Sequence, residues 1–142
     1  DQEPHQGIHA FIKDMNKLYL ENDALYYNDN DVMGFEWMDC ERAETSTVAF
    51  VRRGKTTKKQ LMFILNFTPV AHEQYTVKAP CGGTFREILN SDAPKYGGQG
   101  RLNESPIRAK KVTTDKKKET AYELTCYLPP LSVVVLEYDY KK

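Results

Sequence analysis

The chain has 142 residues, of which 40% are apolar and 28% are charged, and this is enough for one compact domain with a hydrophobic core. Lysine plus arginine equals aspartate plus glutamate at 20 each, so no net charge draws the chain as a whole to nucleic acid or to an anionic membrane. The longest apolar runs, 61–65 and 133–136, are far too short to cross a bilayer. We therefore expect neither nucleic acid nor a membrane as a partner.

The ends and the cysteines indicate where the protein works. The first residues are acidic and polar, unlike a signal peptide, and Asp1 stands where an initiator Met would be. Cys40, Cys81 and Cys126 are odd in number and widely spaced, which favours free thiols in a reducing compartment. We expect a cytoplasmic protein, and a chain that is a piece of a longer one.

The first segment has the spacing of an amphipathic helix. Its apolar side chains recur at three- and four-residue steps: Ile8, Phe11, Ile12, Met15, Leu18 and Tyr19. Asn22 and Asp23 then break the helix. Because this stripe is wide for an element at the edge of a β-sandwich, the helix either packs across one sheet or faces a part of the protein outside this chain.

After Gly34 the apolar period changes to two. Short runs rich in β-branched and aromatic residues follow one another between turn residues, at 35–39, 47–53, 60–67, 74–78, 83–89, 107–112, 121–128 and 132–138. The run 61–65 is apolar on both faces and should be a central strand. The longest loop is expected over 97–105. The fold class is therefore mainly β, an antiparallel β-sandwich preceded by one amphipathic helix.

The chain carries no recognisable catalytic or cofactor motif. His5 and His9 are four residues apart and could share a helix face as metal ligands do, but no third ligand is near, so two unrelated surface histidines are the better interpretation. There is no nucleophile elbow, zinc-protease pair or phosphate-binding loop. We expect no catalytic residue, no cofactor and no metal.

Trp37, the only tryptophan, is the most informative candidate for binding. Phe35 lies on the same strand face, and exposed aromatic rings can stack on the apolar faces of sugars. On this interpretation Glu36 and Asp39 would accept hydrogen bonds from sugar hydroxyls. The alternative is that Trp37 packs in the core or against a neighbouring domain, and the sequence leaves both open.

Several strings are specific enough to indicate a family. They are Gly-Phe-Glu-Trp-Met-Asp at 34–39, Phe-Val-Arg-Arg-Gly at 50–54, Leu-Asn-Phe-Thr-Pro-Val at 65–70, Arg-Glu-Ile-Leu-Asn-Ser-Asp at 86–92 with Tyr-Gly-Gly at 96–98, and Leu-Pro-Pro-Leu at 128–131. In order and spacing they resemble the C-terminal region of bacterial-type glycogen branching enzymes, members of the α-amylase superfamily. The resemblance covers roughly 7–137, and the lysine-rich stretch 101–118 departs from the family's pattern.

The resemblance implies a division of the chain and a role. Residues 1–33 would be the last helix of a missing catalytic barrel plus a linker, and 34–142 an α-amylase C-terminal-like Greek-key domain. Family members are retaining glycosyltransferases that cut an α-1,4-glucan and rejoin the cut end to a 6-hydroxyl, with an aspartate nucleophile and a glutamate acid/base in the barrel. Since those motifs lie upstream of the matched region, no residue here receives a catalytic role.

Two functions follow as expectations. The first is a non-catalytic docking domain in glycogen biosynthesis, whose partner is the catalytic barrel of the parent chain. The alternative is a surface module that tethers α-glucan chains. In an isolated chain the apolar helix would fold back, pair with a second copy as a homodimer, or fray.

Overall fold

Alternating apolar residues place eight strands in one antiparallel sheet. The computed structural model describes residues 3–26, 34–39, 46–56, 58–113 and 120–140. After the helix α1 (Glu3–Glu21) and the 3-10 turn η1 (Asp23–Leu25) come β1 (Phe35–Asp39), β2 (Thr47–Arg52), β3 (Gln60–Asn66), β4 (His72–Ala79), β5 (Gly83–Asn90), the 3-10 turn η3 (Pro94–Tyr96), β6 (Ile107–Thr113), β7 (Thr120–Leu128) and β8 (Ser132–Tyr138). The predicted runs therefore all coincide with strands, and the longest loop lies between β5 and β6.

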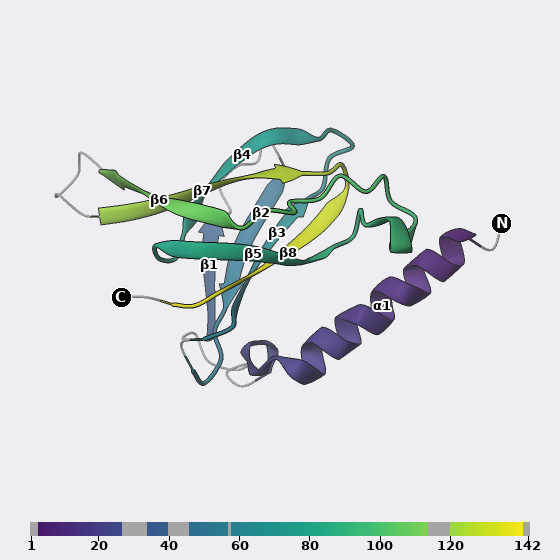
Figure 1. Ribbon diagram of the computed structural model, residues 1–142, viewed down its shortest axis with the longest axis horizontal. Helices are drawn as coiled ribbons and strands as arrows, with labels where there is room; N and C mark the ends of the chain where they lie inside the picture. Colours follow the sequence, from purple (N-terminus) through teal and green to yellow (C-terminus); the bar gives the residue numbers. More distant parts are fainter. Residues whose placement is uncertain (1–2, 27–33, 40–45, 57, 114–119, 141–142) are drawn as a thin grey trace.

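The strand order is β1-β2-β3-β8-β5-β6-β7-β4, and every pair is antiparallel. The first half of β6 pairs with β5 and its second half pairs with β7, so β6 carries the sheet from one layer into the other. The sheet thus curls until its two halves face each other (Figure 1). We call β1, β2, β3, β8 and β5 the first layer and β7 and β4 the second layer, and β6 joins the two. Strands β5, β6 and β7 form a meander with β4 beside β7, which is a Greek key. The predicted fold class is confirmed.

The main core lies between the two layers. Strand β3 contributes Met62 and Ile64 to it, while Leu61 and Phe63 on the opposite face are also buried. This confirms that 61–65 forms a central strand, because only a strand covered on both faces excludes water from consecutive apolar residues. Both layers supply the other large buried side chains of this core, among them Phe85, Leu124, Leu128, Val134 and Leu136.

Asparagine side chains fix the turns between strands. The Asn66 amide donates to the carbonyl oxygens of Val70 and Pro129, at 2.9 Å each, and its oxygen accepts from the backbone N–H and the hydroxyl of Thr68. Asn103 does the same for the long loop, because its amide group bonds both the carbonyl and the N–H of Tyr127 on β7, at 2.9 Å each. These side chains replace the backbone partners that turn residues lack.

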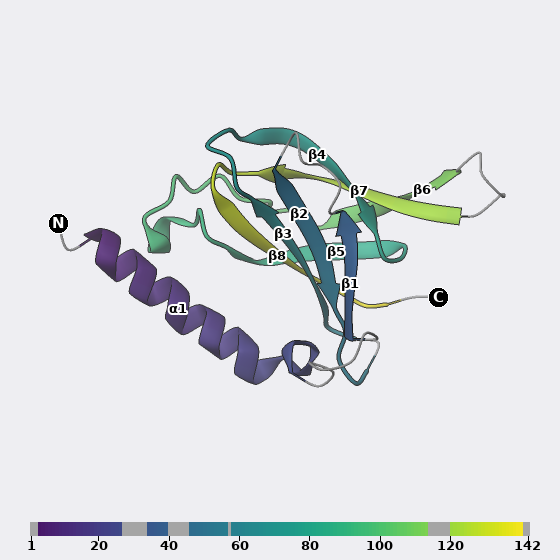
Figure 2. The same cartoon turned by 180° about the vertical axis from the view of Figure 1, so that it is seen from behind.

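The helix α1 covers the outer face of the first layer (Figure 2). Phe11, Met15 and Leu18 pack on a second apolar cluster formed by Leu61, Phe63, Leu89, Val135 and Ala24. The amphipathic helix is therefore folded back on the sheet. No helix among the described residues is long and apolar enough to cross a membrane.

The turn η3 holds the N-terminal half of α1 against the sheet. The Tyr96 hydroxyl donates to the Asp14 carboxylate, and the Lys95 ammonium lies 2.9 Å from the same group. The Phe11 and Tyr96 rings meet edge to face at 5.1 Å. A Cβ on Gly7 would lie 2.3 Å from the Tyr96 carbonyl oxygen, so glycine is what allows this close approach. We call Asp14, Lys95 and Tyr96 the helix latch.

Candidate docking face

The structure divides the predicted apolar stripe of α1 into two halves. Phe11, Met15 and Leu18 turn towards the sheet, while Ile8, Ile12 and Tyr19 stay 59%, 54% and 47% exposed on the flank that points away from the helix latch. Leu20 is 76% exposed as well. A helix that buried all its apolar residues against its own domain would show one covered stripe, whereas here only one half of the stripe is covered.

A row of aromatic rings crosses the outer face of β1, β2 and β3. Phe63 stacks on Phe50 with ring centroids 5.0 Å apart, and Phe50 stacks on Phe35 at 5.0 Å. Trp37 contacts Phe35 and Phe50 edge-on, at 4.9 Å and 5.7 Å. The row begins under the helix at Phe63, which is 7% exposed, and ends at Trp37, which is 53% exposed.

We define the docking face as the exposed helix flank and the outer end of the aromatic row, formed by Ile8, Ile12, Tyr19, Phe35, Trp37 and Phe50. Phe35, Trp37 and Phe50 lie on the outer face of the strands, and Ile8, Ile12 and Tyr19 lie on the exposed flank of the helix that packs on this layer. Large apolar side chains gathered on one side of a domain mark a surface that another body covers.

The predicted binding residues are only partly brought together. Trp37 is exposed and does not belong to the core of the described chain. Glu36, its neighbour in the strand, lies on the opposite face of β1, opposite the buried Val51, and pairs with Arg53. Asp39 ends β1, but its side chain lies outside the part of the chain that the structure describes. The Glu36 carboxylate therefore does not stand beside the indole.

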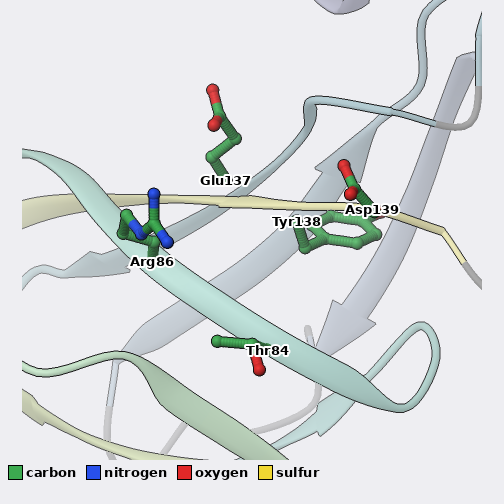
Figure 3. A pocket seen from close by; sticks show the side chains of 5 residues that line it. All are labelled: Thr84, Arg86, Glu137, Tyr138 and Asp139. Atoms are coloured by element: carbon green, nitrogen blue, oxygen red, sulfur yellow. The ribbon is translucent and has the colours of Figure 1, made fainter.

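Among the described residues, the pocket between β5 and β8 does not assemble a catalytic constellation. A shallow polar pocket of about 210 Å³ lies between β5 and β8, lined by Thr84, Arg86, Glu137, Tyr138 and Asp139 (Figure 3). Arg86 is directly opposite Glu137 in the strand register, so a cation lies next to one of its two carboxylates. Among the described residues, no group of three His, Cys, Asp or Glu side chains is placed to hold a metal ion.

Cys81 and Cys126 are both buried and the Cys126 thiol is free, whereas Cys40 lies outside the described residues. Burial raises the pKa of the Cys126 thiol to about 12, with the Glu87 carboxylate adding to the shift. A thiol with such a pKa stays protonated and cannot serve as a nucleophile at neutral pH. Cys126 is therefore a protonated thiol within the core.

Comparison with known proteins decides the family. Residues 37–139 match the family described as alpha amylase, C-terminal all-beta domain. The chain belongs to this family. It is 40% identical over 144 residues to the 1,4-alpha-glucan branching enzyme GlgB of Synechococcus sp. (strain CC9311), a match that covers 99% of this chain and 18% of that protein. The proteins of the same name from Prochlorococcus marinus strains MIT 9515 and NATL1A are 40% and 41% identical over 142 residues, covering 100% and 99% of this chain and 18% of each protein.

The chain thus spans less than a fifth of the length of the relatives it matches. The family resemblance inferred from the short strings is confirmed. The structure also explains two of these strings, because Asn66 in 65–70 and Asn90 in 86–92 are buried and bond the turns that follow their strands. In both strings the asparagine therefore holds the turn that follows its strand.

Sequence reasoning missed the continuation of the aromatic row beyond Phe35 and Trp37, and it missed the helix latch. Phe50 and Phe63 alternate with core residues in their strands, which places them on the outer face. This alternation does not show that Phe63 stacks on Phe50, or that Phe50 stacks on Phe35 of β1. Asp14 and Tyr96 are far apart in the chain, and no local pattern connects them. Pairings of this kind depend on strand order, which the sequence pattern leaves open.

Proposed function

We propose that this chain is the C-terminal β domain of a 1,4-α-glucan branching enzyme and that it binds the catalytic part of that enzyme through the docking face. The parent enzyme would form α-1,6 branches in glycogen in the cytoplasm, as a retaining glycosyltransferase. The chain itself would contribute structure and no catalytic residue. The relatives' name and the small share of their length that the chain covers support this assignment.

The observation that carries the proposal is the exposed apolar half of α1. Ile8 and Ile12 occupy adjacent turns and are more than half exposed although Phe11, between them, is packed on the sheet. Most of each relative's length lies outside the matched region, so the parent chain supplies a large body to cover this surface. We commit to the catalytic part of the same chain as the occupant.

The proposed division of the chain follows from this arrangement. Residues 1–33 would form the last helix of the catalytic barrel with a linker, of which 27–33 lie outside the described residues, and 34–142 the β domain. Because α1 is already packed on the outer face of the sheet, the helix would stand between the two bodies. Its inner half would contact the sheet and its outer half the barrel.

The test compares one substitution in two settings. Ile12→Ser should leave the melting temperature of the 142-residue chain nearly unchanged, because the side chain is already 54% exposed. In the complete branching enzyme the same substitution should lower both the melting temperature and the branching rate, because it removes a contact between the two bodies. Lys13→Ser, at an exposed polar position of the same helix, is the matched control. An Ile12→Ser enzyme as stable and active as its control would contradict the proposal.

A second function is favoured by the exposure of Trp37. Its ring is held edge-on by Phe35 and Phe50, so the indole is fixed without being buried, as a stacking platform for α-glucan requires. By analogy with aromatic–base stacking, one such contact is worth about 1–3 kcal/mol, which gives at best millimolar affinity. Trp37→Ala should then abolish maltoheptaose shifts in NMR spectra and keep the melting temperature. Unchanged binding in a stable variant would remove Trp37 from any sugar site.

If the docking face is uncovered in the isolated chain, we expect a second copy to cover it at high concentration. Sedimentation measurements over a range of protein concentrations would detect this homodimer, and Ile12→Ser should weaken it. A chain that stays monomeric at all concentrations would contradict the homodimer.

A further inference from the structure

Strand β6 places three cations beside a groove on the side of the molecule formed by the second layer. Arg108, Lys110 and Lys111 are exposed, and together with Tyr122 and the Gly82-Gly83 turn they line a shallow groove of about 660 Å³. The groove forms at the corner where β6 leaves β5 and pairs with β7, at the base of the hairpin that projects from the body in Figure 1. It belongs neither to the docking face nor to the pocket in Figure 3.

The lining of this groove is positively charged. It contains three cationic residues and no carboxylate, and none of the three forms an ion pair within the described part of the chain. Glu123 is opposite Lys110 in the register, yet the two make no ion pair. Since the chain as a whole has a formal net charge of zero, this local excess is a feature of β6. Clustered cations that lack internal partners attract anions, and dianions most strongly.

The floor of the groove combines an aromatic ring with a glycine turn. A Cβ on Gly82 would lie 2.7 Å from Cε1 of Tyr122, so the ring rests directly on the backbone at that position. Gly83 has φ +105°, a conformation that side chains of L-residues rarely adopt, which requires glycine there too. Tyr122 is opposite Lys111 in the β6–β7 register, so a ring and an ammonium group stand side by side.

We propose that this groove binds a phosphate monoester carried on a sugar ring. Arg108, Lys110 and Lys111 would bind the phosphate oxygens, with the arginine suited to two parallel hydrogen bonds. The Tyr122 ring would pack against the apolar face of the attached pyranose. The choice of a glucan as the natural carrier rests on the proposed function, whereas the sugar-phosphate site itself depends only on the groove.

The test is an NMR titration of the 142-residue chain at low ionic strength with three probes, namely glucose 6-phosphate, inorganic phosphate and maltose. Glucose 6-phosphate should shift the amides of Gly82, Gly83 and Lys111, and added salt should weaken the binding. Inorganic phosphate should bind at the same place more weakly, and maltose should not bind there. Glucose 6-phosphate binding no better than inorganic phosphate, or shifts confined to other strands, would overturn the proposal.

Variants separate the contributions of the charges and of the ring. The double variant Lys110→Gln/Lys111→Gln should weaken glucose 6-phosphate binding by roughly three- to tenfold. Lys78→Gln, an exposed lysine of the neighbouring β4 outside the groove, is the matched control and should change nothing. Tyr122→Leu, which keeps an apolar side chain at the edge of the core, should weaken glucose 6-phosphate more than inorganic phosphate.

Two results in these variants would refute the assignment. One is unchanged binding in the double lysine variant when circular dichroism shows that it is folded. The other is that a single-stranded oligonucleotide binds more tightly than glucose 6-phosphate and that Tyr122→Leu leaves its affinity unchanged. This result would indicate a surface for polyanions in general. Neither result depends on branching activity, so this proposal and the proposed function fail separately.

Discussion

Replacing Phe11 by alanine tests which half of the helical stripe holds α1 on the sheet. Phe11 packs on the cluster around Phe63 and meets the Tyr96 ring edge to face at 5.1 Å. Truncating a fully buried phenylalanine costs about 3–5 kcal/mol. Since Phe11 is only partly buried, about half of that is expected, and the lost aromatic pair adds roughly 0.5–1 kcal/mol. We therefore expect the free energy of opening α1 to fall by about 2–3.5 kcal/mol.

Native-state hydrogen exchange of the 142-residue chain measures this effect. The amides of α1 should exchange before those of β3 in the unmodified chain, because a short helix depends on tertiary packing. In Phe11→Ala they should exchange roughly 30- to 300-fold faster, since 1.4 kcal/mol corresponds to a factor of ten.

Ile12→Ala is the control for Phe11→Ala, at the neighbouring position on the exposed flank. It should change the free energy of opening α1 by less than about 0.5 kcal/mol, because the side chain is already exposed and alanine favours the helix. Equal acceleration by the two substitutions would refute the assignment of Phe11 to the inner half. Protection of α1 equal to that of β3 in a monomeric sample would refute the expected order of opening.

Three further predictions concern stability, pH and thiol chemistry. Asn66→Ala should lower the free energy of unfolding by roughly 2–4 kcal/mol in urea titrations, because it leaves the buried partners of Asn66 without hydrogen bonds; a loss under 1 kcal/mol would contradict this. The Tyr96 hydroxyl and then the Lys95 ammonium lower the pKa of Asp14, so the stabilising contribution of this carboxylate is present above its ordinary value near 3.9 and is lost as the pH falls through the lowered value. The stability advantage over Asp14→Asn should therefore be full at pH 6 and shrink towards pH 3, and an advantage that does not change with pH would argue against the helix latch. With a pKa of about 12, Cys126 should resist iodoacetamide at pH 8 until denaturant is added, and rapid labelling of Cys126 in the native chain would disprove its burial.

The sequence by itself determined the elements of this protein. Alternation with period two is a local property, so each β-strand could be located from its own residues, and the two-sided apolar run of β3 indicated its central place. The helix followed in the same way from its three- and four-residue spacing. The short strings indicated the family because they encode turns fixed by residues such as Asn66, whose hydrogen bonds are mostly local.

Only the tertiary structure decided what these elements face. The stripe of α1 gave no sign of which half would be covered, because that depends on where η3 and β5 lie relative to the helix. Glu36 and Trp37 are neighbours in sequence but lie on opposite faces of β1, and only the aromatic rings of β2 and β3 show which face carries the row. The basic groove likewise exists because β6 changes partners from β5 to β7. Such contacts join residues far apart in the chain, and their geometry is set by strand order and sheet curvature, which no local pattern of residues specifies.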